Sequence, residues 1–248
     1  MLLSLINFMK ENRIMIIIFS IILLVIALAI IWLIKGKKEK INSQTVATIG
    51  IFTAFSIVLY FLKFNLPFIF PEFLEINFSL LPVIIIGFMY GPVEAITIVI
   101  LRAIIKIPFT STACVGEFAD VLIGIPVALV TSLIYLKKHD RKGAVIALIC
   151  CIITWVAAGV LTNYFINIPF FIQFYFNGEV SGLLAFFKII PGVNESNYMI
   201  KSIIYAFIPF NLLISVIVSL VTFLVYKKIS ILFCMTVAQI LTPKWDSA

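Results

Sequence analysis

The sequence alternates between long apolar runs and short polar connections. Seven apolar segments are distinguished, and they are Ile14–Ile34, Thr45–Leu62, Asn77–Tyr90, Val93–Ile107, Glu117–Leu136, Ala144–Ile168 and Ile203–Tyr226. A helix that crosses the hydrocarbon core of a bilayer needs about 20 mostly apolar residues. Within lipid, the backbone polar groups must be satisfied internally, and a helix does this within one segment. The pattern therefore predicts an all-α integral membrane protein.

Two of these segments are too short to cross a bilayer on their own. Asn77–Tyr90 and Val93–Ile107 are separated by Gly91-Pro92, a dipeptide typical of turns. At 1.5 Å per residue, each segment extends roughly 21–23 Å, whereas the hydrocarbon core is about 30 Å thick. Short helices at membrane depth are tolerated where they border a cavity or other protein. This pair is therefore a first indication of a binding site.

Composition supports the membrane assignment and excludes other classes. The chain is 63% hydrophobic and 12% charged, with a mean hydropathy of +1.23. Soluble domains average about 45–50% apolar and about 25% charged residues. The net charge of +7 is not arranged as a basic stripe interleaved with aromatic residues, so the sequence does not indicate nucleic-acid binding.

The distribution of basic residues predicts the topology, because cytoplasmic loops are enriched in Lys and Arg. On one side lie the eleven residues Lys35, Lys37, Lys38, Lys40, Lys137, Lys138, Arg141, Lys142, Lys227, Lys228 and Lys244. On the other side lie the five residues Lys10, Arg13, Lys63, Lys188 and Lys201. The C-terminus is thus predicted in the cytoplasm and the N-terminus outside. The connections Lys63–Glu75, Pro108–Gly116 and Pro169–Asn197 then face the medium.

The chain divides into three parts. Residues 1–44 hold the first apolar segment and a basic linker, and we interpret them as a retained signal-anchor helix. Residues 45–228 hold the other six segments and form the predicted membrane domain. Residues 229–248 are a tail whose apolar run, Ile231–Leu241, is too short to span the membrane and is placed at the interface or left unordered.

Charged residues inside the fourth and fifth segments are candidates for function, because charges at membrane depth are costly unless they are paired or face a cavity. Arg102 and Lys106 are four residues apart on one helix, and Glu117 and Asp120 are three apart on the next. The two pairs flank one outward loop, so they could meet. Either they lock two helices together or they form the polar floor of a ligand site.

Asn163 and Asn211 are lone amides in apolar helices, near the predicted outer ends of those helices. A buried amide needs hydrogen-bond partners, which another helix or the edge of a flat heterocycle can provide. Gly50 and Ala54 form a small-xxx-small pair that lets another helix approach closely.

Motifs for catalysis are not found in the sequence. It contains no GxxxxGK[ST] phosphate loop, no HExxH and no GxSxG, and its four cysteines lack metal-ligand spacing. Its single histidine, His139, lies in a basic turn. The sequence therefore predicts no enzyme, no catalytic residue, no metal and no cofactor.

From Thr45 to Lys228 the chain resembles the substrate-binding S component of an energy-coupling factor (ECF) vitamin transporter, and it is most similar to the riboflavin-specific branch. The resemblance rests on the ordered strings TIGIFTAFSIVLYFLKFNLPF, INFSLLP, YGPVEA, FTSTACVGEFADVLIG, TNYFINIPFF and IPFNLLISVIVSLV. It implies a six-helix bundle with an outward cavity, here preceded by one extra helix. It also implies a vitamin ligand, a transmembrane T component and two cytoplasmic ATPases as partners.

The resemblance also implies roles for residues. Gly50 and Ala54 match the small residues that dock on the T component, and Asn163 and Asn211 match asparagines of the riboflavin branch. That branch usually has lysine where this chain has Ile214. The predicted substrate-binding residues are Asn163, Asn211, Asp120, Glu117, Asn77, Phe68, Tyr164, Arg102 and Lys106. The alternatives are a different vitamin or heterocycle, a stand-alone secondary transporter, and a membrane scaffold without a ligand.

Overall fold

The computed structural model describes residues 43–110 and 112–241, and describes side chains as far as residue 229. The predicted signal-anchor helix Ile14–Ile34 lies outside the described residues. The described helices are α3 (Ser43–Phe61), α4 (Leu80–Met89), α5 (Pro92–Lys106), α6 (Val115–Lys137), α7 (Arg141–Thr162), α8 (Ile168–Tyr175), α9 (Val180–Leu184), α10 (Tyr198–Ser202) and α11 (Ile208–Leu241). Short π-helical or 3₁₀ segments are η1 (Ile107–Phe109), η2 (Asn163–Asn167), η3 (Ala185–Phe187) and η4 (Ile203–Phe207).

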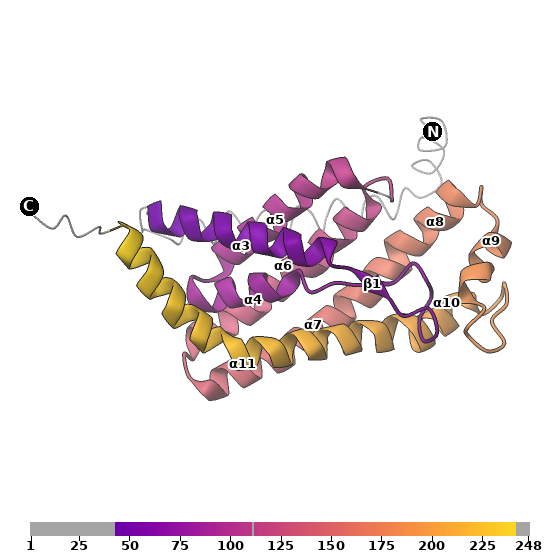
Figure 1. Cartoon of the computed structure of the whole chain (residues 1–248). Helices are drawn as coiled ribbons and strands as arrows, with labels where there is room; N and C mark the ends of the chain where they lie inside the picture. Colours follow the sequence, from indigo (N-terminus) through magenta and orange to yellow (C-terminus); the bar gives the residue numbers. More distant parts are fainter. Residues whose placement is uncertain (1–42, 111, 242–248) are drawn as a thin grey trace, which may run out of the picture.

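The described chain crosses the bundle six times, which confirms the predicted all-α membrane core (Figure 1). Four continuous helical stretches are long and apolar enough to span a bilayer: Ser43–Phe61, Val115–Lys137, Arg141–Tyr175 and Tyr198–Ile229. The other two crossings are α4, with 10 residues, and α5, with 15 residues. Their shortness agrees with the sequence pattern, and the break between them is made by Gly91, which has a φ of +108°, followed by Pro92 at the first helical position.

The short helix α4 lies at the centre of the bundle. Val83, Ile84, Ile85 and Ile86 are each fully buried, so four consecutive residues point into protein on all sides. A helix that is apolar all around is expected to be buried on every face. Contacts with α3, α5, α6 and α11 enclose α4. At 1.5 Å per residue, its 10 residues extend only about 15 Å, less than the thickness of the hydrocarbon core.

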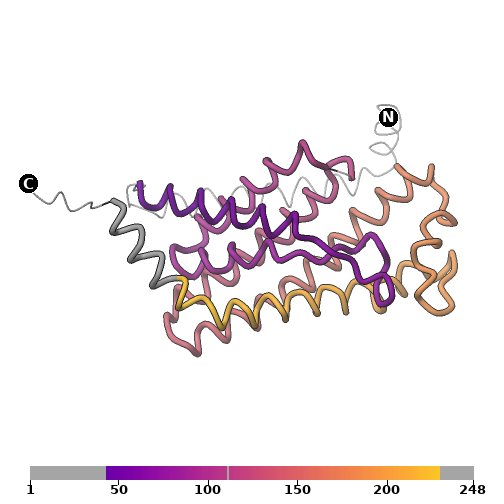
Figure 2. The backbone as a smooth tube through the Cα atoms, viewed as in Figure 1, coloured from indigo at the N-terminus to yellow at the C-terminus, as the bar shows by residue number. Residues whose placement is uncertain are grey.

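The two ends of the bundle differ in build. At one end are the start of α3, the turn around Gly91 and the turn between α6 and α7 (Figure 1). At the other end lie α8, α9, α10 and a small hairpin of strands β1 (Phe64–Asn65) and β2 (Glu75–Ile76). We call residues 64–76 the hairpin. Figure 2 shows the hairpin reaching across to the start of α11, where Phe70 packs edge-on against Phe210 at 5.4 Å between ring centroids.

The fifth and sixth crossings are longer than the sequence pattern predicts. The span expected to end at Ile168 continues to Tyr175, and the span expected to begin at Ile203 begins at Tyr198. In each case a proline, Pro169 or Pro209, lies two residues after the end of a π-helical turn. Proline has no backbone N–H to donate within a helix, and its ring clashes with the carbonyl of the preceding turn. A π turn is wider than an α turn and pairs each N–H with a carbonyl five residues earlier, so the hydrogen bonds just before the proline are rearranged. These prolines therefore do not end the helices.

The last helix also extends beyond its predicted end. α11 runs without interruption past Tyr226 and Lys228 to Leu241. The expected boundary between the membrane domain and the tail, at residues 228 and 229, therefore lies inside a helix. The apolar run Ile231–Leu241 continues the preceding helix because nothing in its sequence, neither proline nor glycine, interrupts the helix.

Candidate functional site

An aromatic pocket opens at the end of the bundle that carries the hairpin. Its volume is about 380 Å³, within the range of about 300–1,000 Å³ that is usual for small-molecule sites. The lining residues are Phe73, Glu75, Thr112, Phe171, Tyr175, Phe176, Leu183 and Phe186. Most of this lining is aromatic, and the carboxylate of Glu75 and the hydroxyls of Thr112 and Tyr175 are its polar groups. Such a pocket suits a flat, largely apolar ring that carries a few hydrogen-bonding groups.

Phe73 connects the hairpin to the rest of the pocket. Its ring centroid lies 6.2 Å from Phe171 on α8, 6.2 Å from Phe186 and 5.8 Å from Phe187 on η3, and 6.3 Å from Phe207 on η4. The pairs are tilted or edge-on, which are preferred arrangements for aromatic rings. One side chain of the hairpin therefore packs against three segments that are remote in the sequence.

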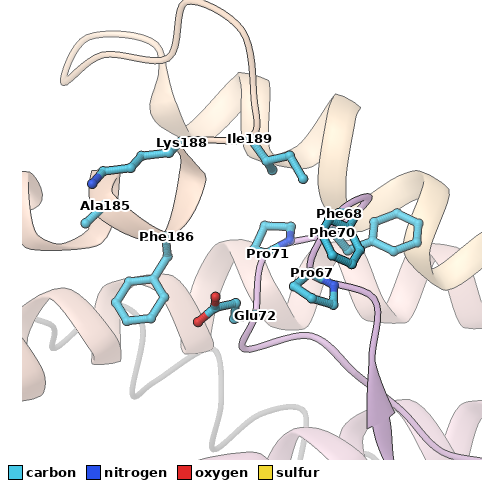
Figure 3. Close-up of a pocket in the computed structure, with 9 residues that line it drawn as sticks. All are labelled: Pro67, Phe68, Phe70, Pro71, Glu72, Ala185, Phe186, Lys188 and Ile189. Atoms are coloured by element: carbon cyan, nitrogen blue, oxygen red, sulfur yellow. The ribbon is translucent and has the colours of Figure 1, made fainter.

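A second hollow, of about 580 Å³, lies between the hairpin and residues 185–189 (Figure 3). It is lined by Pro67, Phe68, Phe70, Pro71, Glu72, Ala185, Phe186, Lys188 and Ile189. Phe68, one of the predicted ligand residues, is 93% exposed at the tip of the hairpin. It borders this second hollow and is not among the residues of the aromatic pocket. Phe186 belongs to both, so the two cavities are neighbours.

Among the intramembrane charges, one base and one acid form an ion pair, Lys106 with Asp120. Lys106 Nζ lies 2.5 Å from Asp120 Oδ2, and it also lies 3.2 Å from the ring centroid of Tyr60. The Lys106 side chain is 1% exposed and that of Asp120 is 29% exposed. A buried ammonium needs such a partner, and an aromatic face adds further attraction. The contact joins α3, α5 and α6. It therefore agrees with the first of the two alternatives from the sequence, in which the charges hold helices together.

Glu117 orders the loop that leads to the aromatic pocket. Thr110 Oγ1 donates to Glu117 Oε2 at 2.8 Å and accepts a hydrogen bond from the backbone N–H of Cys114 at 3.0 Å. Thr112, which lines the pocket, lies between these two loop residues. Glu117 is itself buried. The structure thus places this predicted ligand residue behind the pocket wall, where it holds the loop.

Arg102 and Asn77 lie below the hairpin and are not among the residues of the aromatic pocket. Arg102 Nη1 donates to Ser79 Oγ at 2.6 Å. Ser79 Oγ donates to Asn77 Oδ1, also at 2.6 Å. The two predicted residues are therefore brought together through one serine.

The two candidate amides flank Gly159 at the contact between α7 and α11. Asn163 Nδ2 donates to the Gly159 carbonyl at 2.8 Å, and Asn163 Oδ1 accepts from Asn167 at 3.0 Å. Asn211 Nδ2 donates to the Phe207 carbonyl at 2.8 Å. Both side chains are buried and bond within their own helices. Their contact with a ligand stays a prediction.

Tyr164, the neighbour of Asn163, is exposed and packs edge-on against Phe165.

The sequence reading missed most rings of the aromatic pocket. Phe73, Phe171, Tyr175 and Phe186 were not singled out, although the aromatic density of Phe170–Phe176 marks the right stretch. Within the described residues, no group of three or more His, Cys, Asp or Glu side chains is arranged to hold a metal ion.

Gly50 and Ala54 lie on an exposed face of α3. A Cβ atom added at Gly50 would meet nothing within 4 Å. The apolar residues Val46, Ile51 and Val58 on the same helix are also exposed. In a membrane this face contacts lipid or another helix.

Comparisons with known proteins agree with this architecture. The family model described as the substrate-specific component of ECF transporters matches residues 44–226. A riboflavin transporter, RibU, from Staphylococcus aureus is 28% identical, over 78% of this chain and 95% of its own length. The riboflavin transporter FmnP of Bacillus subtilis is 21% identical, over 75% of this chain and 92% of its own length.

A solved structure gives the same result for the fold. The S component of a bacterial ECF transporter superimposes with a TM-score of 0.58 and 26% identity. The match covers 76% of this chain and 96% of the solved one.

Proposed function

Because the chain belongs to the family of substrate-specific components of ECF transporters, we propose that it binds riboflavin at the outer face of the membrane and delivers it for uptake. The observation that carries the proposal is the aromatic pocket of about 380 Å³ at the end of the bundle that holds the hairpin. The two similar proteins RibU and FmnP are named as riboflavin transporters, which supports the same ligand. The positive-inside rule assigns this end of the bundle to the outside.

The pocket offers two kinds of contact that match a flavin. Phe73, Phe171 and Phe186 present apolar rings for the flat heterocycle, and stacking of a base on an aromatic side chain is typically worth about 1–3 kcal/mol. Thr112 and Glu75 supply polar groups for a hydroxylated chain. Glu75 is held in place by Lys63, whose Nζ lies 2.9 and 2.8 Å from the two carboxylate oxygens.

Riboflavin is expected to lose fluorescence when it is titrated with the purified protein. Replacing Phe171 with alanine removes one ring of the pocket and should weaken binding by about 1–3 kcal/mol, or roughly five- to more than a hundredfold. Phe223→Ala is the matched control, because Phe223 packs near Tyr226 and does not line the pocket. A flat titration with the wild-type protein would remove riboflavin as ligand. If Phe171→Ala and the control bind riboflavin with equal affinity, the ligand does not bind in this pocket.

We further propose that the exposed face of α3 docks on a transmembrane T component that is coupled to two cytoplasmic ATPases. Small side chains allow two membrane helices to approach closely, and Gly50 and Ala54 leave that face open. The long axis of α3 runs from the hairpin to the opposite end of the bundle, so a partner on this helix would lie beside the whole membrane domain (Figure 1).

Ala54→Trp tests the docking proposal. The bulky ring should keep the partner helix at a distance and abolish riboflavin uptake by cells that contain the whole transporter. Riboflavin binding by the isolated protein should be unchanged, since Ala54 faces away from the pocket. Ile153→Trp on the exposed face of α7 serves as the control for a large ring in the membrane. Normal uptake by Ala54→Trp would show that another face of the protein meets the T component.

A further inference from the structure

Arg102 is a buried cation that forms no salt bridge with a carboxylate among the described residues. Its side chain is 1% exposed. The ion pairs of the described residues join Lys63 to Glu75 and Lys106 to Asp120, and neither pair includes Arg102. Burying an ion costs several kcal/mol unless its hydrogen bonds compensate. Filling the same space with an apolar side chain would avoid this cost, so the guanidinium calls for an explanation beyond packing.

The hydrogen bonds of Arg102 converge on the residue that precedes α4. Nη1 donates to Ser79 Oγ at 2.6 Å and to Ser56 Oγ on α3 at 3.4 Å. Ser56 Oγ also donates to the Ser79 carbonyl at 2.6 Å. Ser79 Oγ donates a hydrogen bond to Asn77 Oδ1, which also accepts from the Ser79 N–H at 3.3 Å. Since hydrogen bonds with an ionised partner are roughly twice as strong as neutral ones, Arg102 is the firmest anchor in this group.

This group lies at the base of the hairpin. Asn77 follows β2 directly, and Glu75 and Phe73 of the hairpin line the aromatic pocket. At about 3.3 Å per residue, the anchored Asn77 is only about 7 Å along the chain from Glu75. The hairpin has two residues in each strand, and an isolated hairpin is marginally stable at best. The position of this pocket wall therefore depends on how its base is held.

We propose that Arg102 is a positioning residue for the aromatic pocket. The buried guanidinium fixes Ser79 and, through it, Asn77, and so holds the hairpin in the place where Phe73 and Glu75 face the ligand. Arg102 acts on the ligand only through these residues. A wall that is ordered before binding saves the ordering cost at the moment of binding. The inference rests on the proposed function for its ligand, whereas the anchoring of the hairpin can be measured without one.

Two variants separate anchoring from general stability. Ser79→Ala keeps the charge of Arg102 but removes the link to Asn77, and Arg102→Met removes the charge while keeping an elongated side chain. In both variants, trypsin should cut the folded protein after Lys63, at the start of the hairpin, about tenfold faster than in the wild type, because a charged hydrogen bond that held the hairpin is lost. The cut is identified by mass spectrometry without any ligand present.

Riboflavin dissociation gives the second measurement. The dissociation rate should rise about tenfold in both variants, while the association rate changes little. Thr131→Val is the control, because Thr131 is fully buried and donates only to the carbonyls of Val127 and Ala128 in its own helix. Cleavage and dissociation rates in Ser79→Ala that equal those of the control would overturn the proposal. Ser79→Ala decides alone if Arg102→Met does not fold. If the variants are cleaved faster but the wild-type protein binds no riboflavin, the anchoring role of Arg102 is supported and riboflavin is rejected as the ligand.

Discussion

Replacing Asp120 with alanine is expected to lower the free energy of unfolding by about 3 kcal/mol, the lower end of the usual cost of removing one partner of a buried ion pair, because Asp120 is itself 29% exposed. The physical reason is that Lys106 stays behind at 1% exposure without its carboxylate. The aromatic face of Tyr60, 3.2 Å from the ammonium, recovers only part of that loss. The loss should appear as a lower thermal midpoint of the detergent-solubilised protein.

The companion variant tests this explanation. Asp120→Leu combined with Lys106→Met replaces the pair by apolar groups, and such replacements of buried pairs are often neutral or stabilising. The double variant should therefore be more stable than Asp120→Ala. Measuring Asp120→Leu and Lys106→Met separately completes a double-mutant cycle, which gives the coupling energy. If the double variant is as unstable as Asp120→Ala, the loss comes from the shape of the site and not from the unpaired charge.

Gly159→Ala is expected to cost about 1–3 kcal/mol of stability, although alanine is normally the better helix former by about 1 kcal/mol. The added Cβ would overlap Asn211 Oδ1 and would lie 2.6 Å from its Cγ and 2.8 Å from its Nδ2. All of these distances are shorter than real contacts of a Cβ atom. Asn211 is buried, so its amide must either move away from the Phe207 carbonyl or push α11 away from α7.

The affinity for riboflavin should fall together with the stability in Gly159→Ala. The π-helical turns η2 and η4 lie next to the α7–α11 contact and carry or adjoin the rings of the pocket, so we expect the affinity for riboflavin to fall at least tenfold. Gly159→Ala with Asn211→Ala removes the clash and should recover stability relative to Gly159→Ala alone. Gly50→Ala is the control for helix propensity, because no atom lies within 4 Å of the new Cβ. An unchanged thermal midpoint for Gly159→Ala would contradict the close approach of the two helices.

The membrane segments are the part of the fold that the sequence predicts best. The second apolar run, Thr45–Leu62, differs from α3 by only a residue or two at each end, and Gly91-Pro92 marks the break between α4 and α5. Hydrophobicity decides these elements locally, since lipid requires a continuous apolar stretch. The meeting of Lys106 and Asp120 is predicted for the same reason, because a charge in such a stretch needs a partner.

The sequence pattern ends one helix too early, at a proline. The predicted connection begins at Pro169, whereas a π turn before this residue allows the helix to continue; Pro209 lies within a predicted span and also follows a π turn. Whether a proline ends a helix depends on how the preceding turn rearranges its hydrogen bonds, and neighbouring helices decide this. The pocket was missed in consequence, since Phe171 and Tyr175 face it only because α8 continues the line of α7.

The site residues show a similar limit. An asparagine in an apolar helix signals a needed hydrogen bond, but the sequence does not tell whether a ligand or a carbonyl one turn earlier provides it. Asn163 and Asn211 both use the carbonyl four residues earlier in the described structure. Arg102 likewise signals a buried charge, while its path through Ser79 to Asn77 depends on the packing of α3, α4 and α5.

The two π turns have a consequence for how this chain is compared with its relatives. A π turn closes its hydrogen bonds over one more residue than an α turn, so each of η2 and η4 amounts to a single-residue insertion within a helix. Both are followed by the same tripeptide, Ile-Pro-Phe, at residues 168–170 and 208–210. Since successive residues of an α-helix are about 100° apart, a relative with a plain α turn here would need a one-residue gap in its alignment. Without that gap, residue roles beyond the turn would be transferred to the wrong face of the helix.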